Sequence, residues 1–184
     1  FLDYLRQHLL ADAGDAVPEA ELQTWLREPG IPDFAPVYEA QAFAAIETAR
    51  SAFLAGERAA GELAGKEWNT HEWLYFLDGL PQQVDIEKLS SLDEAFSLTR
   101  TGNSEIAFAW FQVGIRNGYT PIRARLEQFL IEVGRRKFVV PLYRSLAARD
   151  EDRAWAQAVY AKAKPGYHPI TTGSVDEVFA NTAK

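Results

Sequence analysis

Three consecutive cations, Arg135, Arg136 and Lys137, are the group in this sequence best suited to bind a ligand. An arginine guanidinium is a planar fork that binds a carboxylate through two hydrogen bonds, and a lysine ammonium adds a mobile point charge. We expect Gly134 to end one helix, and Pro141 disfavours helical geometry for the residue before it. The three cations are therefore predicted at or near a turn between two helices, from which their side chains can project into a cleft. The alternative interpretation is an ordinary solvated basic corner.

A second candidate is the start of a zinc-binding motif. His71 and Glu72 begin like the HExxH signature, in which two histidines one helical turn apart face the same metal. Tyr75 stands where the second histidine is required, and none of the three histidines in the chain are spaced as ligands. We therefore expect no metal site in this chain, and we expect Glu72 to cap a helix.

Other catalytic signatures are missing from the sequence. It contains no GxSxG nucleophile elbow, no P-loop and no dinucleotide-binding glycine pattern. Carboxylates are plentiful, but nothing marks two of them as an acid–base pair. We therefore predict no catalytic residue in this chain.

Charge is distributed unevenly along the 184 residues. Residues 1–100 hold 7 basic and 18 acidic side chains, whereas residues 101–184 hold 12 basic and 8 acidic ones, and the net charge is −7. Eight of the basic residues, against two acidic ones, lie between Arg116 and Arg149. This local positive field attracts anionic ligands. Nucleic acid is not an expected partner, because the whole chain is acidic and no aromatic platform interleaves with the cations.

Composition narrows the protein class further. The chain has no Cys, which excludes disulfides and thiolate zinc sites, and 47% of its residues are hydrophobic. No apolar run approaches the roughly 18 to 20 residues of a membrane span, so we expect a soluble protein without a membrane partner. The sequence leaves the compartment open between cytoplasm and periplasm. Because the chain also has no Met, we expect it to be a piece of a longer polypeptide.

The segments around the cations, which must position them, show mainly the periodicity of helices. The pattern predicts helices over 103–117, 120–133, 138–148 and 150–163, and no useful segment alternates with period two. The fold class is therefore predicted to be all-α, an α-α superhelix of paired antiparallel helices like HEAT or armadillo repeats. Within the first helix, Ile106–Ile115 is apolar nearly all round, which predicts burial between neighbouring helices.

Capping residues, glycines and prolines in the sequence predict where helices and domains begin and end. Capping-box spacing occurs at Ser91 with Glu94, at Ser174 with Glu177 and, more loosely, at Asn69 with Glu72. Thr120-Pro121 is a predicted helix start, and Gly102, Gly118 and Gly134 are predicted helix ends. Three prolines and a glycine within 29–36 predict an extended connector between residues 1–28 and a helical domain over 37–184.

Four strings of the sequence are specific when taken together. They are LQTWLREPGIPDFAP at 22–36, NSEIAFAWF at 103–111, GRRKFVVPLYRSLA at 134–147 and YHPIT at 167–171. In order and spacing they resemble the C-terminal helical domain of the leukotriene A4 hydrolase-like zinc aminopeptidases, a gluzincin family. The resemblance covers the chain from about Leu22 to Thr171, and FLDYLR at 1–6 is similar to the end of the preceding catalytic domain.

The resemblance implies a role in an aminopeptidase. In that family the zinc ligands and the catalytic glutamate belong to a domain that this chain lacks, so the chain alone is expected to be inactive and to hold no cofactor. Its expected partners are that catalytic domain of the same polypeptide and a short peptide substrate. The resemblance assigns Arg135 and Lys137 to bind the free carboxylate of the peptide, while the domain closes the substrate cleft. Arg136 and Val140 depart from the family pattern, which often has an apolar and a basic residue there.

A second function remains open from the residues alone. A free-standing helical-repeat scaffold would use the basic stretch 116–149 to bind an acidic protein partner.

Overall fold

The computed structural model describes residues 1–12, 17–36 and 41–181. Its contacts divide the chain into two compact units, Phe1–Glu39 and Ala40–Lys184. Each unit is described by itself. The proposed assignment of residues 1–28 to the end of a preceding domain remains a prediction.

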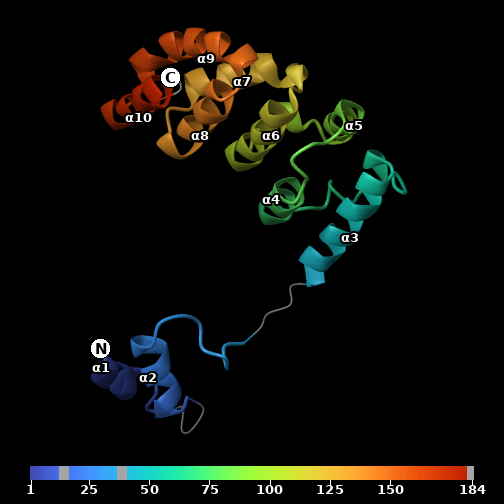
Figure 1. The fold of residues 1–184 in the computed structure, drawn as a ribbon. Coiled ribbons are helices and arrows are strands. Elements are labelled where there is room, and N and C mark those ends of the chain that lie inside the picture. Colours follow the sequence, from blue (N-terminus) through green and yellow to red (C-terminus); the bar gives the residue numbers. More distant parts are fainter. Residues whose placement is uncertain (13–16, 37–40, 182–184) are drawn as a thin grey trace. The chain divides into compact units, whose positions relative to one another are not determined.

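Among its described residues, the first unit contains two short helices, and none of the residues in these helices is buried. Helix α1 spans Leu2–His8 and α2 spans Glu19–Arg27 (Figure 1). Arg6 links them, because its Nη2 lies 2.5 Å from Glu19 Oε1. Large apolar side chains remain exposed on both helices, among them Trp25 at 50%. Residues 29–36 form neither helix nor strand, and one backbone hydrogen bond, from Ala35 N to Pro32 O, marks a turn within them.

Helices are the only regular secondary structure in the described residues of the second unit. Its helices follow one another along an arc (Figure 1). Four short 3-10 turns lie between them: η2 (Ala60–Glu62), η3 (Leu98–Arg100), η4 (Thr120–Ile122) and η5 (Lys164–Gly166). The α-helices are α3 (Gln41–Ala55), α4 (Thr70–Asp78), α5 (Ile86–Phe96), α6 (Ser104–Asn117), α7 (Arg123–Glu132), α8 (Arg136–Ala147), α9 (Asp150–Ala163) and α10 (Pro169–Asn181).

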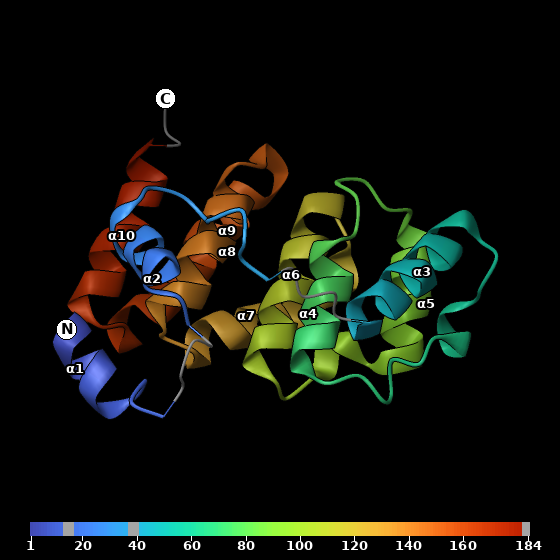
Figure 2. The ribbon, with the colours of Figure 1, turned by 90° about the horizontal axis from the view of Figure 1, so that it is seen from below.

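Alternate helices pack side by side. Helix α4 contacts α6, α6 contacts α8, and α8 contacts α10, which makes one row, while α7 and α9 contact each other beside that row (Figures 1 and 2). This arrangement confirms the predicted α-α superhelix of paired helices. No strand occurs within the ranges that the structure describes.

Helix α6 forms the centre of the hydrophobic core, as its all-round apolar pattern predicts. Trp110 and Phe111, which project about 100° apart around this helix, are both fully buried. Trp110 Nε1 donates to Thr99 Oγ1 at 2.9 Å, which satisfies its single polar group. Gly114 lets the next segment approach closely, because a Cβ there would lie 2.6 Å from Ile122 Cδ1.

A buried carboxylate joins the starts of α7 and α9. Asp152 is 5% exposed and accepts hydrogen bonds on both oxygens. Arg123 donates to Oδ1, and Arg149 Nε donates to Oδ2 at 2.7 Å. A carboxylate this deeply buried requires such partners, because burial of an unpaired charge is costly.

Two sequence-based expectations about helix ends are wrong. Ser91 and Ser174 lie inside α5 and α10, so neither caps a helix. Helix α10 instead begins at Pro169, whose fixed φ suits the first helical position. Pro141 does not hold its predecessor out of a helix, because α8 already begins at Arg136 and continues through Pro141 to Ala147. The proline removes one backbone donor from that helix.

Other helix ends agree with the sequence pattern. The Asn69–Glu72 capping box is present, with Asn69 Oδ1 accepting from the backbone N of Glu72 at 3.1 Å. Residues 120–122 form a 3-10 turn with Pro121 near its start, and α7 follows. Gly118 ends α6 with φ of 67°, a conformation that favours glycine. Gly102 and Gly134 follow helical segments without positive φ.

Replacing Asn69 by Ala is expected to destabilise α4 by about 1 kcal/mol, because two backbone amides lose their acceptor. The comparable change Ser91→Ala is expected to have almost no effect, since Ser91 caps nothing. Hydrogen–deuterium exchange over residues 70–78 measures the first effect, and exchange over 86–96 measures the second. Equal effects of the two substitutions would contradict the assigned cap.

Candidate functional site

The three predicted cations lie at the start of α8. Arg135 precedes the helix, and its carbonyl accepts the first two helical hydrogen bonds, from the backbone N of Phe138 and of Val139. Arg136 and Lys137 occupy the first turn. Phe138 anchors this turn, because its ring is 3% exposed and packs 6.0 Å from the ring of Phe129. The cluster of Arg135, Arg136 and Lys137, called here the α8 cationic cluster, is thus held by the core.

Two members of the cluster have a polar partner in the described chain, and the third has none recorded there. Arg136 Nε donates to Ser174 Oγ on α10 at 2.8 Å. Lys137 Nζ lies 2.5 Å from Glu105 Oε1 on α6. Arg135 has no carboxylate partner among the described residues, and its guanidinium lies 5.5 Å from the centre of the Phe138 ring. Arg135 is exposed, so its fork is open to a ligand.

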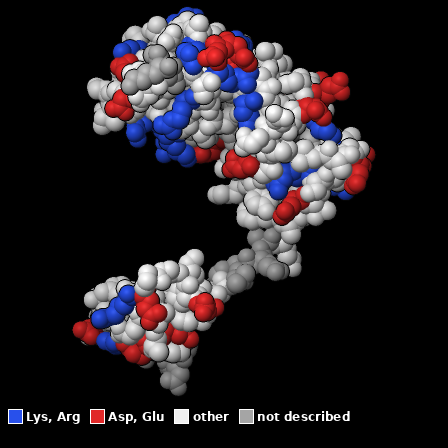
Figure 3. Space-filling model, viewed as in Figure 1, with Lys and Arg blue, Asp and Glu red and all other residues white. Residues whose placement is uncertain are grey.

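The electrostatic environment of the cluster favours anions. The amino-terminal end of α8 carries the positive end of the helix dipole, together with backbone amides that lack helical acceptors. Figure 3 shows Lys and Arg side chains gathered over the part of the second unit that carries α8 and α10. Within the described chain, Glu105 is the one carboxylate that forms an ion pair with a member of this cluster. The arrangement can bind a carboxylate, and it contains no acid–base pair that could perform chemistry.

Sequence reasoning missed two contacts of the site. Glu105 lies within the NSEI string, yet nothing in the sequence pairs it with Lys137, 32 residues later. Ser174 stands 38 residues from Arg136. Both contacts depend on α8 packing between α6 and α10, so the packing order of the helices would have been needed to find them.

The incomplete zinc motif does not fit a metal ion. Glu72 uses Oε2 to accept from the backbone N of Asn69 at 2.7 Å, as a capping residue. Tyr75 stacks on Phe43 with ring centres 4.6 Å apart. His71 is exposed at the start of α4. Across the described ranges, no group of three or more His, Cys, Asp or Glu side chains could hold a metal ion.

Comparisons with known proteins agree on one family. The family model "Leukotriene A4 hydrolase, C-terminal" matches residues 68–179. Leukotriene A-4 hydrolase of Xenopus laevis is 26% identical over 166 residues, which are 87% of this chain and 27% of that protein. Aminopeptidase B of Mus musculus is 24% identical over 189 residues, covering 98% of this chain and 29% of that protein. The chain therefore spans less than a third of the length of these curated relatives.

Solved structures share the fold. Native yeast LTA4 hydrolase superimposes with a TM-score of 0.77 over 97% of this chain and 32% of that protein, at 24% identity. Its complex with bestatin matches with a TM-score of 0.73 at 23% identity. No helix in the part of this chain that the structure describes is long and apolar enough to cross a membrane.

The Lys137–Glu105 pair is expected to contribute little to stability. Its two side chains are 51% and 34% exposed, and such pairs are typically worth less than about 1 kcal/mol. Glu105→Gln should therefore leave the free energy of unfolding nearly unchanged. Asp152→Asn, which disrupts a buried carboxylate with two arginine partners, should cost about 3 kcal/mol or more.

Urea denaturation followed by circular dichroism measures both changes. If Glu105→Gln destabilises the protein as strongly as Asp152→Asn, Lys137 is a structural residue and is not available to a ligand.

Proposed function

The chain belongs to the family of leukotriene A4 hydrolase C-terminal domains, and from that premise we propose that it is the helical domain of a larger zinc aminopeptidase. In this proposal the domain closes the substrate cleft, and Arg135 and Lys137 bind the free carboxylate of short peptide substrates. Relatives named as a leukotriene A-4 hydrolase and as aminopeptidases support the enzyme class.

One observation carries the assignment of the carboxylate site. The guanidinium of Arg135 is exposed at the amino-terminal end of α8 and pairs with no carboxylate of the described chain. Most other arginines of the second unit's later helices are engaged, as Arg123, Arg149 and Arg153 are with carboxylates. An open fork beside a helix amino terminus is suited to bind an incoming carboxylate in two hydrogen bonds.

Lys137 would act as the second, adjustable charge of the clamp. Its ion pair with Glu105 is half-exposed, so the ammonium can exchange this partner for a ligand carboxylate at low cost. Arg136 turns toward Ser174, and we therefore assign it no direct contact with substrate. Glu105 would keep Lys137 extended on the surface of α6 until substrate binds.

Such a clamp would promote catalysis by positioning. Holding the far end of a peptide fixes the distance from the carboxylate to the scissile bond, so binding energy remote from the reacting atoms aligns that bond. The zinc ion of the proposed enzyme would activate water, and its ligands would come from a part of the polypeptide outside this chain. The residues that the structure describes do not form a site for that metal, and in this proposal they contribute orientation only.

The scaffold hypothesis receives less support. It rests on the basic stretch 116–149, yet Arg123, Arg125 and Arg149 in that stretch lie beside carboxylates of the same chain. Their charge is partly neutralised before any acidic partner arrives. Family membership further favours the enzyme over the scaffold.

The clamp is tested in the full-length protein with a tripeptide that has either a free or an amidated carboxyl terminus. Arg135→Ala is expected to lower kcat/KM for the free tripeptide about 100-fold, because the carboxylate loses its bidentate partner. It should leave kcat/KM for the amidated tripeptide nearly unchanged.

Arg144→Ala is the matched control. Arg144 is an exposed arginine within α8, nine residues after Arg135, and it has no carboxylate partner among the described residues. The control should preserve the preference for the free carboxylate. If Arg135→Ala also preserves it, the α8 cationic cluster is a solvated surface and the domain's role is architectural.

A further inference from the structure

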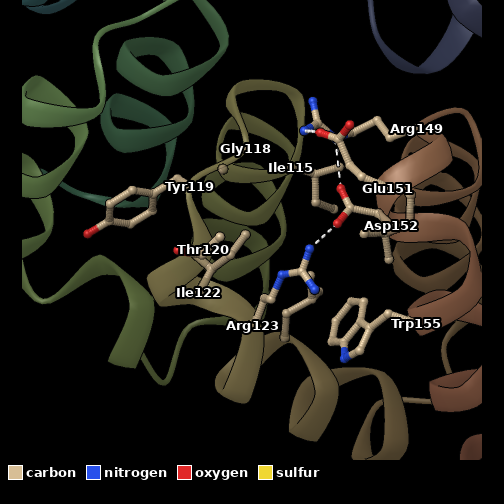
Figure 4. A pocket seen from close by; sticks show the side chains of 13 residues that line it. Ile115, Gly118, Tyr119, Thr120, Ile122, Arg123, Arg149, Glu151, Asp152 and Trp155 are labelled. Atoms are coloured by element: carbon tan, nitrogen blue, oxygen red, sulfur yellow. Dashed lines mark hydrogen bonds and ion pairs between the residues drawn. The ribbon is translucent and has the colours of Figure 1, made fainter.

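A pocket lies near the opposite end of α8 from the cationic cluster. It has a volume of about 330 Å³ and opens between the last turns of α6 and α8 and the first turns of α7 and α9 (Figure 4). The 12 residues of α8 separate its two ends by about 18 Å. No member of the α8 cationic cluster lines the pocket.

The floor of the pocket is apolar. Ile115, Ile122, Leu126 and Leu146 line it, and each is at most 3% exposed. The indole of Trp155 forms one wall (Figure 4). Small-molecule pockets in proteins have volumes of roughly 300 to 1,000 Å³, so this one suits a compact apolar group. A long acyl chain or a folded segment would not fit.

The mouth of the pocket holds two arginines and two acids. Arg123 and Arg149 share the buried carboxylate of Asp152, and both of its oxygens are occupied by them. Figure 4 shows the guanidinium of Arg123 between Trp155 and Asp152, and its centre lies 5.1 Å from that of the indole ring. Glu151 pairs with Nη2 of Arg149 from an exposed position, with 68% of its side chain accessible.

Most of the hydrogen-bonding groups that remain unused at the mouth of the pocket are donors. Among the described residues, Arg123 donates a hydrogen bond only through Nη2, to Asp152. Its Nε and Nη1 have no acceptor there. Arg149 can exchange Glu151 for another acid, because an exposed ion pair contributes little free energy. A cationic ligand would find Asp152 already satisfied. The mouth is therefore chemically suited to an anion.

Backbone geometry holds Arg149 in place for this role. Its Nη1 donates to the carbonyl of Arg116 at 3.3 Å, at the end of α6. Gly118 makes room for the guanidinium, because a Cβ there would lie 3.1 Å from Arg149 Nη2 and its φ of 67° already disfavours a side chain. The donor is thus preorganised, which lowers the cost of ordering it around a ligand.

We propose that this pocket binds a small carboxylic acid with an aliphatic or aromatic body. The apolar body of the acid lies on the floor of the pocket. Its carboxylate replaces Glu151 as the partner of Arg149 and also accepts hydrogen bonds from Arg123. An amino acid and a simple organic acid share this chemistry. The proposal does not depend on the peptide clamp, because the two sites have no residue in common. If the mouth serves only to tie α7 to α9, no such acid will bind.

Calorimetric titration of the full-length Arg135→Ala protein tests the proposal, because this background removes the open arginine of the other site. N-acetyl-L-leucine is expected to bind, and N-acetyl-L-leucinamide, which lacks only the charged carboxylate, is expected to bind at least about tenfold more weakly. A third titration uses free L-leucine. If L-leucine binds with similar affinity, the ligand class is amino acids. If L-leucine does not bind, the ligand class is organic acids without an ammonium group.

Two neighbouring acids provide a matched pair of variants. Glu151→Gln weakens the competing carboxylate and should tighten N-acetyl-L-leucine binding by about two- to fivefold, the range that an exposed ion pair allows. Asp150→Asn removes the same charge one residue away, where the side chain is 90% exposed and pairs with Arg153. It should leave the affinity unchanged.

The proposal is overturned if the acid and its amide bind equally, or if neither binds at millimolar concentration. It is also overturned if Glu151→Gln and Asp150→Asn give the same affinity, since binding would then occur elsewhere in the protein. Arg123→Gln should weaken binding about tenfold, and its circular dichroism spectrum shows whether it folds. The Glu151→Gln result decides the question even if Arg123→Gln does not fold.

Discussion

Burial of α6 is the constraint on which the second unit depends. The helix is apolar on nearly every side, so it must be covered on more than one face, and α4 and α8 pack against it as neighbours in one row. Trp110 and Phe111 are completely enclosed as a result. Because the row continues from α8 to α10, the position of every later helix in it follows from this central one.

Both candidate binding regions derive their geometry from that packing. At one end, α6 supplies Glu105 beside Lys137, and the ring of Phe138 holds the first turn of α8 against the core. At the other end, α6 stops at Gly118, and the carbonyl of Arg116 in its last turn accepts a hydrogen bond from Arg149. The two ends of one buried pair of helices thus present arginines in different settings. One guanidinium faces solvent, and two share a buried carboxylate.

Local patterns in the sequence predicted what depends on neighbouring residues along the chain. The all-α class, the burial of Ile106–Ile115 and the Asn69–Glu72 cap each follow from short-range periodicity or spacing, and the structure confirms them. The prediction that Pro141 would keep the preceding residue out of a helix was wrong, because the packing of α8 outweighed a local preference of the backbone. The pairing of Lys137 with Glu105 and of Asp152 with Arg123 depended on which helices touch, which residue spacing cannot supply. The roles of Arg135 and Lys137 came from family resemblance and not from physical pattern.

The row of helices also has a consequence for how the chain is made. Each member contacts one only two helices away, so most contacts join segments that leave the ribosome close together in time. Structures with such local contacts fold quickly, since little entropy is lost in closing each loop. The second unit can thus be assembled progressively during synthesis, with each emerging helix completing the surface left by its predecessors.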